Sequence, residues 1–158
     1  MSIEAAGVRQ TGAMEHVAIT SLDPFRFSTV IGEDRTDLFA VQAAQEALER
    51  LHGRSVINVN STAAGGGVAE MLHVLLGLIR GVGIDAQWLV IGGNPEFFEV
   101  TKRLHNHLYG TAGDGGSLGP AEHRIYVDTL QPEKDELSAH AREGDIVVLH
   151  DPQVAGLA

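Results

Sequence analysis

The sequence predicts an α/β domain: a Rossmann-like, mostly parallel sheet flanked by helices. Short apolar runs rich in β-branched residues, at 56–60, 84–91 and 145–149, alternate with helical patterns of about 12–15 residues. Glycines stand at the turns between these segments. Polar side chains that could take part in binding or catalysis follow the first and the last of the three strands. Open parallel sheets bind ligands beyond the carboxyl ends of their strands.

The first third of the chain divides into an N-terminal extension, residues 1–33, and the start of the domain proper, which spans residues 34–158. Residues 1–15 are small, polar and unpatterned, so we expect them to be frayed. Alternating apolar residues predict extended structure over 16–31, interrupted at Asp23 and Pro24. Residues 34–51 are predicted to be a helix because apolar residues recur at three- and four-residue spacing: Leu38, Val41, Ala44, Leu48 and Leu51.

The middle of the chain reads as strand, helix, strand and helix in turn. The strand at 56–60 precedes a helix over 68–82, which is apolar on several sides and therefore expected to be buried. After the strand at 84–91, a turn with Pro95 near a helix start leads into a helix over 96–109.

The last third begins with a glycine-rich stretch, residues 110–119, which we expect to be a flexible loop. A strand at 124–127 and a polar helix at 132–142 are predicted next. The strand at 145–149, which is apolar after Asp145, is expected to lie in the centre of the sheet, and residues 154–158 to begin another helix.

Composition excludes several classes of function. Eleven basic against 21 acidic residues leave a net charge of −10, which is unfavourable for nucleic-acid binding. The chain has no cysteine and no His-x-x-x-His pair, so we expect no metal site. No apolar run reaches the roughly 20 residues that cross a bilayer, and no signal pattern is present, so we expect a soluble, cytoplasmic protein with no membrane contact.

Three consecutive glycines, Gly65, Gly66 and Gly67, follow the strand at 56–60 and open the next helix. A glycine turn leading into a helix N-terminus can cradle an anionic group with backbone N–H donors. The dinucleotide fingerprint would need a third glycine where Glu70 stands, so the match to it is weak. Glu70 could accept hydrogen bonds from sugar hydroxyls, or it could simply favour the helix dipole after a tight turn.

Three segments carry a family resemblance: NVNSTAAGGGVAEMLHVLLGLIRGVGIDAQWLVIGG, PEFFEVTKRLHNHLYG and DIVVLHDPQ. Over residues 34–158 the chain resembles the N-terminal domain of trehalose glycosyltransferring synthases, which are retaining glycosyltransferases of the two-domain GT-B architecture. The resemblance implies the N-terminal half of a GT-B fold, glucose as acceptor and an NDP-glucose donor such as UDP-glucose or ADP-glucose, with no further cofactor. It also implies a C-terminal donor domain that this chain lacks, so the chain alone is expected to be inactive.

The resemblance also implies roles for individual residues. Gly65, Gly66 and Gly67 would approach the donor diphosphate, and Glu70 would lie near the sugar subsites. His150 would contact the donor sugar near the reacting centre, as the one catalytic candidate. An imidazole at a strand end can donate to a hydroxyl or stabilise developing charge, or it can merely pack in a turn.

The remaining candidates are expected to bind the substrate. Lys102 and Asn106 share a predicted helix face, and the resemblance implies acceptor contacts for His105 and Asn106. Gln153 could reach a hydroxyl from the turn after His150. The alternative for Lys102, His105 and Asn106 is that they form a solvated helix face without a ligand.

Two other interpretations stay open at this point. The chain could be a stand-alone Rossmann or flavodoxin-like module that binds a nucleotide or sugar without catalysis. A separated domain would instead expose an apolar face where its missing C-terminal partner belongs, and such a face can produce a homodimer.

Overall fold

A computed structural model describes residues 14–158, in which four strands form one sheet. The strands are β1 (Glu15–His16), β2 (Val56–Asn60), β3 (Ala86–Val90) and β4 (Ile146–Leu149), in the spatial order β1-β3-β2-β4. β2 is parallel to both β3 and β4, and only β1 runs antiparallel, against β3. The mostly parallel α/β sheet predicted from the sequence is confirmed.

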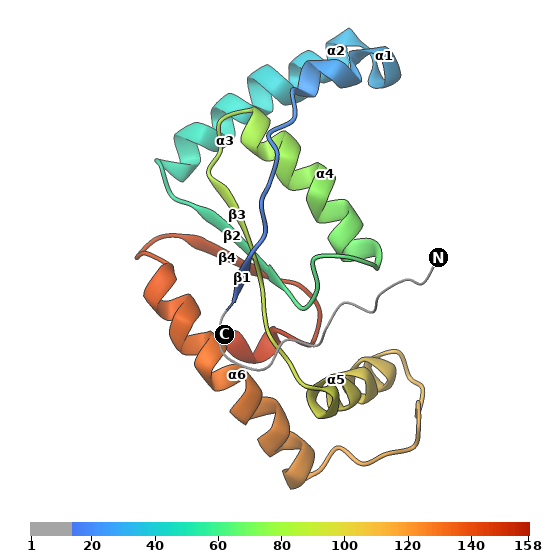
Figure 1. The fold of residues 1–158 in the computed structure, drawn as a ribbon. Coiled ribbons are helices and arrows are strands. Elements are labelled where there is room, and N and C mark those ends of the chain that lie inside the picture. The colour runs from blue at the N-terminus through green and yellow to red at the C-terminus, as the bar shows by residue number, and fades with distance from the viewer. Residues whose placement is uncertain (1–13) are drawn as a thin grey trace, which may run out of the picture.

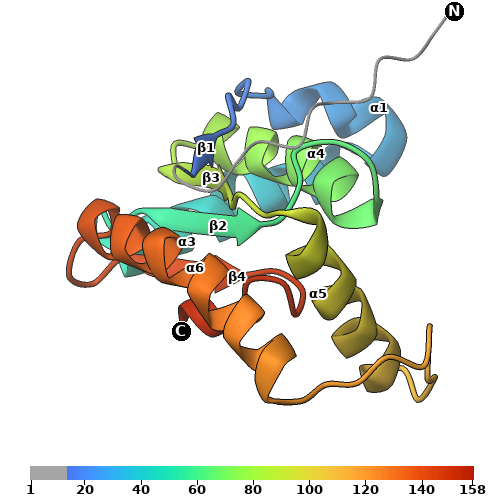
Figure 2. The same cartoon turned by 60° about the horizontal axis from the view of Figure 1, so that its bottom comes forward.

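Helices cover both faces of this sheet (Figure 1). Helix α4 (Gly67–Gly81) lies on one side, while α5 (Pro95–Leu108) and α6 (Pro120–His140) lie on the other, as Figure 2 shows from a second direction. Ile57 and Val59 of β2 belong to the buried cluster shared with α5 and α6. Because side chains alternate along a strand, Asn58 and Asn60 lie on the face toward α4.

The N-terminal part differs from the sequence prediction. Residues 1–13 lie outside the described residues, so most of the segment expected to be frayed is not tested, but Met14 is buried and Glu15 already belongs to β1. The extended structure predicted for 16–31 is wrong in its second half, because residues 24–31 are helical. There the carboxylate of Asp23 accepts a hydrogen bond from the Phe25 N–H at 3.0 Å and starts the short helical turn η1 (Pro24–Phe27).

A nearly continuous helical arm follows this turn. It comprises α1 (Ser28–Ile31), α2 (Glu33–Asp37), the π-helical turn η2 (Leu38–Ala43) and α3 (Ala44–Leu51), as Figure 1 shows. The helix predicted over 34–51 is confirmed, and His52 in a left-handed conformation ends it one residue before Gly53.

Helix α6 replaces the strand predicted at 124–127, so that prediction is wrong. The helix predicted at 132–142 is confirmed over residues 132–140, but it is the second half of a longer helix. The carboxylate of Glu122 accepts from the Gly119 N–H at 2.9 Å, and Pro120 occupies the first turn, which starts the helix twelve residues early. Pro132 then lies inside the helix, where it removes one backbone donor without ending it.

Strand β4 stands at the end of the sheet order, so the prediction of a central strand is wrong for the described chain. Its residues Ile146, Val147 and Val148 are 38%, 38% and 36% exposed. After His150 the chain forms only the short turn η3 (Ala155–Leu157), whose Leu157 is buried under α6. Within the described residues, no helix combines the length and the apolar character needed to cross a membrane.

Two glycines let the segment before η1 cross the surface of α4. The Leu22 N–H donates to the Gly77 carbonyl at 2.9 Å, and a Cβ on Gly81 would collide with the Leu22 carbonyl oxygen. A backbone carbonyl cannot rotate away as a side chain can, so this crossing needs the absence of a side chain at Gly81.

We therefore expect Gly81→Ala to destabilise the domain by about 1–3 kcal/mol through overpacking. Gly67→Ala is the matched control, because Gly67 begins the same helix and an added Cβ there meets no atom within 4 Å. Urea unfolding of both variants measures the difference. Equal stability of the two variants would contradict the crossing.

Glu133 is a buried carboxyl group on α6. It is 1% exposed, and its Oε1 accepts a hydrogen bond from the Gly92 N–H at 3.0 Å. Its Oε2 has no hydrogen-bond partner among the described residues. Burial raises the pKa of Glu133, against the lowering effect of the Gly92 N–H and with a smaller raising effect from Glu136.

A raised carboxyl pKa in the folded state lowers stability as the pH rises from the ordinary glutamate value, about 4.3, through the folded value. Glu133→Gln keeps an acceptor for Gly92 without a buried charge. We expect this variant to be more stable than the parent chain at pH 7 and equally stable near pH 4, by urea unfolding across pH. A variant less stable than the parent at pH 7 would refute this expectation.

Glu122→Gln is the control, because we expect it to change the stability at pH 7 in the opposite direction. The pKa of Glu122 is lowered by backbone hydrogen bonds from its own N–H and that of Gly119, and by the Ser117 hydroxyl. Its carboxylate therefore stabilises the fold above the ordinary glutamate pKa, and this contribution disappears as the pH falls. Glu122→Gln should be less stable than the parent at pH 7.

Candidate functional site

The carboxyl ends of three parallel strands meet at one edge of the sheet. β2 leads into the glycine loop (residues 61–67), β3 leads into the turn at 91–94, and β4 leads directly into His150. Since β2 is hydrogen-bonded to both neighbours in parallel, the glycine loop and His150 leave adjacent strands at the same edge. Such an edge is where open α/β sheets bind ligands.

The glycine loop has backbone conformations that favour glycine. Gly65 and Gly66 have φ angles of 76° and 85°, and Gly66 immediately precedes the first turn of α4. An added Cβ at Gly65, Gly66 or Gly67 would meet no atom within 4 Å, so the loop is open around all three. Exposed amide donors at this helix N-terminus could therefore be approached closely by an anion.

Side chains beneath the loop hold its shape. The Asn60 amide Nδ2 donates to the Thr62 carbonyl at 2.7 Å, and the Asn60 Oδ1 accepts from Trp88 Nε1 at 2.8 Å. His73 of α4 lies edge-on against Trp88, with ring centroids 4.6 Å apart, and its Nε2 contacts the Ala63 carbonyl at 3.1 Å. Trp88 is 1% exposed, so it supports the loop from within the core.

His150 is held from two directions. Its backbone N–H donates to the Val59 carbonyl at 2.9 Å, and its ring Nε2 lies 3.0 Å from Oδ1 of Asn58. The side chain is half-buried, and burial lowers its pKa while the Asp151 carboxylate opposes that shift. Burial therefore favours the neutral form of the ring, and a neutral imidazole can exchange hydrogen bonds with a hydroxyl group.

The chain turns sharply after His150. Asp151 has a φ angle of 69°, which aspartate tolerates better than most residues. Gln153, a predicted substrate contact, follows in this turn as a half-buried residue whose Oε1 is buried and has no partner among the described residues. A buried acceptor left unpaired in this way is unfavourable, and a donor group of a ligand would satisfy it.

The candidates on α5 divide between two faces of the helix. Lys102 and Asn106 both line one hollow of about 520 Å³. The other residues that line it are Pro95, Phe98, Glu99, Arg103 and Asp114. His105 does not line it: this half-buried ring lies 4.7 Å from the Tyr109 ring, and its Nδ1 is buried without a partner among the described residues. The shared face expected for Lys102 and Asn106 is thus observed, and His105 stands apart from it.

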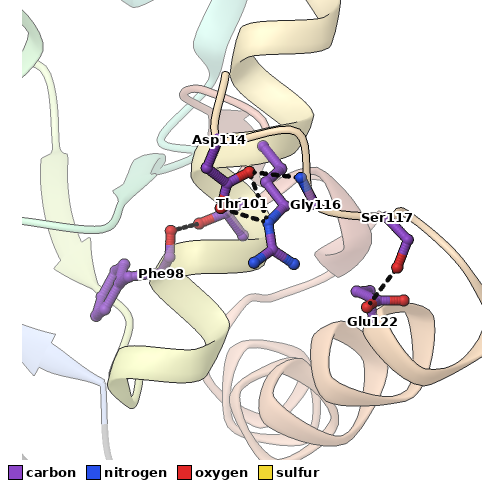
Figure 3. Close-up of polar contacts among 7 residues, drawn as sticks. Phe98, Thr101, Asp114, Gly116, Ser117 and Glu122 are labelled. Atoms are coloured by element: carbon purple, nitrogen blue, oxygen red, sulfur yellow. Dashed lines mark hydrogen bonds and ion pairs between the residues drawn. The ribbon is translucent and has the colours of Figure 1, made fainter. Parts of the chain in front are cut away.

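Residues 110–119 have polar anchors against α5 that the sequence analysis missed, as Figure 3 shows. Arg103 Nε lies 2.8 Å from Oδ2 of Asp114, and the Asp114 Oδ1 accepts from the Gly116 N–H at 3.0 Å. A Cβ on Gly113 would collide with Asn106, and one on Gly116 with Arg103. The segment expected to be a flexible loop is therefore attached to α5 through Gly113, Asp114 and Gly116, while most of its residues are exposed.

The structure thus assembles part of the predicted site at one edge. Gly65, Gly66 and Gly67, with His150 and Gln153, all follow the carboxyl ends of β2 and β4, whereas Lys102 and Asn106 line the separate hollow on α5. Glu70 is exposed on the first turn of α4.

Sequence reasoning missed the two asparagines of β2. Asn58 and Asn60 are 5% and 2% exposed, and their amides contact His150 and the base of the glycine loop. The pattern VINVN could have revealed them, because it places two amides at alternate positions of a buried strand. No group of three metal-binding side chains lies close enough to hold a metal ion in the part of the chain that the structure describes.

Comparison with known proteins identifies the family. The family described as the N-terminal domain of trehalose synthase matches residues 58–158. A trehalose synthase of Pyrococcus horikoshii is 42% identical over 131 residues, which are 83% of this chain and 29% of that protein. One from Rubrobacter xylanophilus is 40% identical over 111 residues, or 70% of this chain and 26% of that protein.

A second group of relatives carries a different name. A trehalose phosphorylase of Grifola frondosa is 42% identical over 105 residues, which are 62% of this chain and 14% of that protein. The chain thus spans about three tenths of the length of the trehalose synthases that it matches. From residue 58 onward it belongs to the family of trehalose synthase N-terminal domains, with the α/β fold of the N-terminal half of a GT-B protein.

Proposed function

We propose that this chain is the acceptor-side domain of a retaining glycosyltransferase that joins glucose from an NDP-glucose donor to a second glucose and forms trehalose. The hydroxyl oxygen of the acceptor would form a bond to the donor sugar carbon, and the bond from that carbon to the diphosphate oxygen would break on the same face. The proton of the acceptor hydroxyl would pass to the departing diphosphate oxygen. His150 would contact the reacting sugar, and the amides at Gly65, Gly66 and Gly67 would stabilise the leaving diphosphate.

The observation that carries this proposal is the juxtaposition of two groups on adjacent parallel strands. An open glycine turn at a helix N-terminus follows β2, and an imidazole held by Asn58 follows β4. One suits an anionic leaving group, and the other suits a sugar hydroxyl. Gln153, with its unpaired buried oxygen, would add a further hydroxyl contact.

The acceptor contacts proposed for α5 are a separate element. Lys102, Asn106 and Glu99 surround the hollow beside Phe98, so charged and amide groups stand next to an aromatic ring. This mixture suits a polyhydroxylated ligand. Glu70 remains a proposed sugar contact on the exposed first turn of α4.

A separate donor domain is part of the proposal. β4 ends the described sheet with three half-exposed apolar residues, and α4 carries further exposed apolar side chains: Met71, Val74 and Leu75. Apolar surface of this kind is what a second domain, or a second copy of the chain, would cover. The donor-binding groups would then lie outside this chain, and we expect the isolated chain to be inactive for that reason.

Phosphorolysis of trehalose is the second candidate, because trehalose phosphorylases are also among the relatives. The same glycine turn would then hold inorganic phosphate in place of a nucleotide diphosphate. The two reactions share the sugar contacts and differ in the anion.

We expect the isolated chain to bind glucose or trehalose weakly and to turn over less than about 1% as fast as a two-domain enzyme. Titration of ¹⁵N-labelled chain should shift the amide signals of His150 and Gln153. UDP-glucose or ADP-glucose with glucose, and phosphate with trehalose, are the two activity assays. Full turnover by the chain alone would refute the need for a second domain, and tight nucleotide binding without turnover would favour a stand-alone module.

Substitutions in the glycine turn test the anion site. Gly66→Ala forces a side chain into φ 85° and ψ 154°, a strained region for other residues, at a cost of about 1–3 kcal/mol. We expect it to weaken the amide shifts that inorganic pyrophosphate causes at residues 65–68. Gly67→Ala is unstrained, so its effect on pyrophosphate separates close backbone approach from loop conformation. Pyrophosphate shifts that survive both substitutions would contradict the proposed role of the turn.

A further inference from the structure

The buried amide of Asn58 is only partly paired, which is unfavourable if the residue serves the stability of the fold alone. Asn58 is 95% buried at the centre of the sheet, between Trp88 of β3 and Val148 of β4. Its Nδ2 has no hydrogen-bond partner among residues 14–158. A buried donor without a partner destabilises a fold, and an aliphatic side chain would avoid that penalty.

Within residues 14–158, the side chain of Asn58 makes one hydrogen bond, to His150. The Asn58 Oδ1 lies 3.0 Å from His150 Nε2, on the face of the sheet toward α4. An amide oxygen only accepts, so Nε2 of the ring must carry the proton. In a neutral imidazole the other nitrogen, Nδ1, is then unprotonated and can accept a hydrogen bond.

We infer that Asn58 is a positioning residue that fixes both the orientation and the tautomer of His150, so that Nδ1 accepts a hydrogen bond from a sugar hydroxyl. This inference rests on the proposed contact of His150 with substrate and makes that contact specific. The ring does not donate to the sugar, because its only N–H is already engaged by Asn58.

The register of the strands explains why the amide must come from β2. Val59 pairs with Leu149, and the Val59 carbonyl accepts from the His150 N–H, so the histidine begins where the β2–β4 ladder ends. From there its ring reaches back across the ladder to Asn58. Asn60 is the neighbouring amide on the same face, but its Oδ1 is engaged by Trp88 and its Nδ2 by Thr62.

The first experiment uses the parent chain. Imidazole ¹⁵N shifts at a pH above the pKa of His150 identify which ring nitrogen carries the proton, and loss of the signals in His150→Gln assigns them. We expect a protonated Nε2 and an unprotonated Nδ1 in the free chain. A proton on Nδ1 would overturn the inference without any effect on the proposed function.

The second experiment changes the amide. Asn58→Asp places a carboxylate beside Nε2, and should raise the pKa of His150 by about one to three. Asn58→Leu removes the acceptor, and should lower that pKa further, because the protonated ring also donates to Asn58. Asn58→Leu should fold at least as stably as the parent, whereas a structural role for the amide would make it less stable.

The control is Asn94→Asp. Asn94 lies in the turn after β3, where its Oδ1 caps α5 by accepting from the Phe97 N–H at 2.8 Å, a bond that aspartate retains. The Asn94→Asp substitution therefore adds the same charge as Asn58→Asp at the same edge of the sheet, but without a contact to His150. A pKa of His150 that changes equally in Asn58→Asp and Asn94→Asp would overturn the inference.

Glucose titrations of the same variants separate the two proposals. We expect Asn58→Leu to weaken the glucose-induced shifts at His150 at least several-fold, and Asn94→Asp to leave them unchanged. If the parent chain shows the expected tautomer and no glucose shifts, the proposed function fails while the positioning by Asn58 stands. If glucose binds the parent and Asn58→Leu equally, the positioning role fails.

Discussion

The site depends on one constraint: two asparagine amides must be buried in β2, the strand that is paired on both sides. Burial of an amide is unfavourable unless its polar atoms are paired. Asn60 meets that demand fully, with Trp88 on one side and the base of the glycine loop on the other. Asn58 meets it in part, through His150. The strand that carries the core thus also orients both halves of the proposed site.

The two faces of the sheet have different roles because successive side chains of β2 point to opposite faces. Ile57 and Val59 join the apolar cluster under α5 and α6, which supplies hydrophobic stabilisation. The opposite face, toward α4, combines the amides with Trp88 and His73. Rigid support beneath the glycine loop is what a site needs if backbone amides are to meet an anion without rearrangement.

The outer side of α5 is organised by a different principle. The Arg103–Asp114 ion pair is partly exposed and therefore contributes little to stability. Its value is geometric, because it brings Gly113 and Gly116 into close approach with Asn106 and Arg103. The hollow that holds Lys102 and Asn106 is shaped by this loop as much as by the helix itself.

Local pattern in the sequence determined the sheet, its three main strands and the helices α4 and α5, because apolar periodicity and glycine turns act over neighbouring residues. It also placed the glycine turn and His150 at strand ends. Local caps start helical structure at Asp23 and Glu122, where extended structure was predicted, and the sequence analysis missed both. Contacts between more distant residues decided the rest, and Arg103 anchors a loop from eleven residues away. The partner of His150 lies 92 residues away, on a strand that only the folded sheet brings beside it.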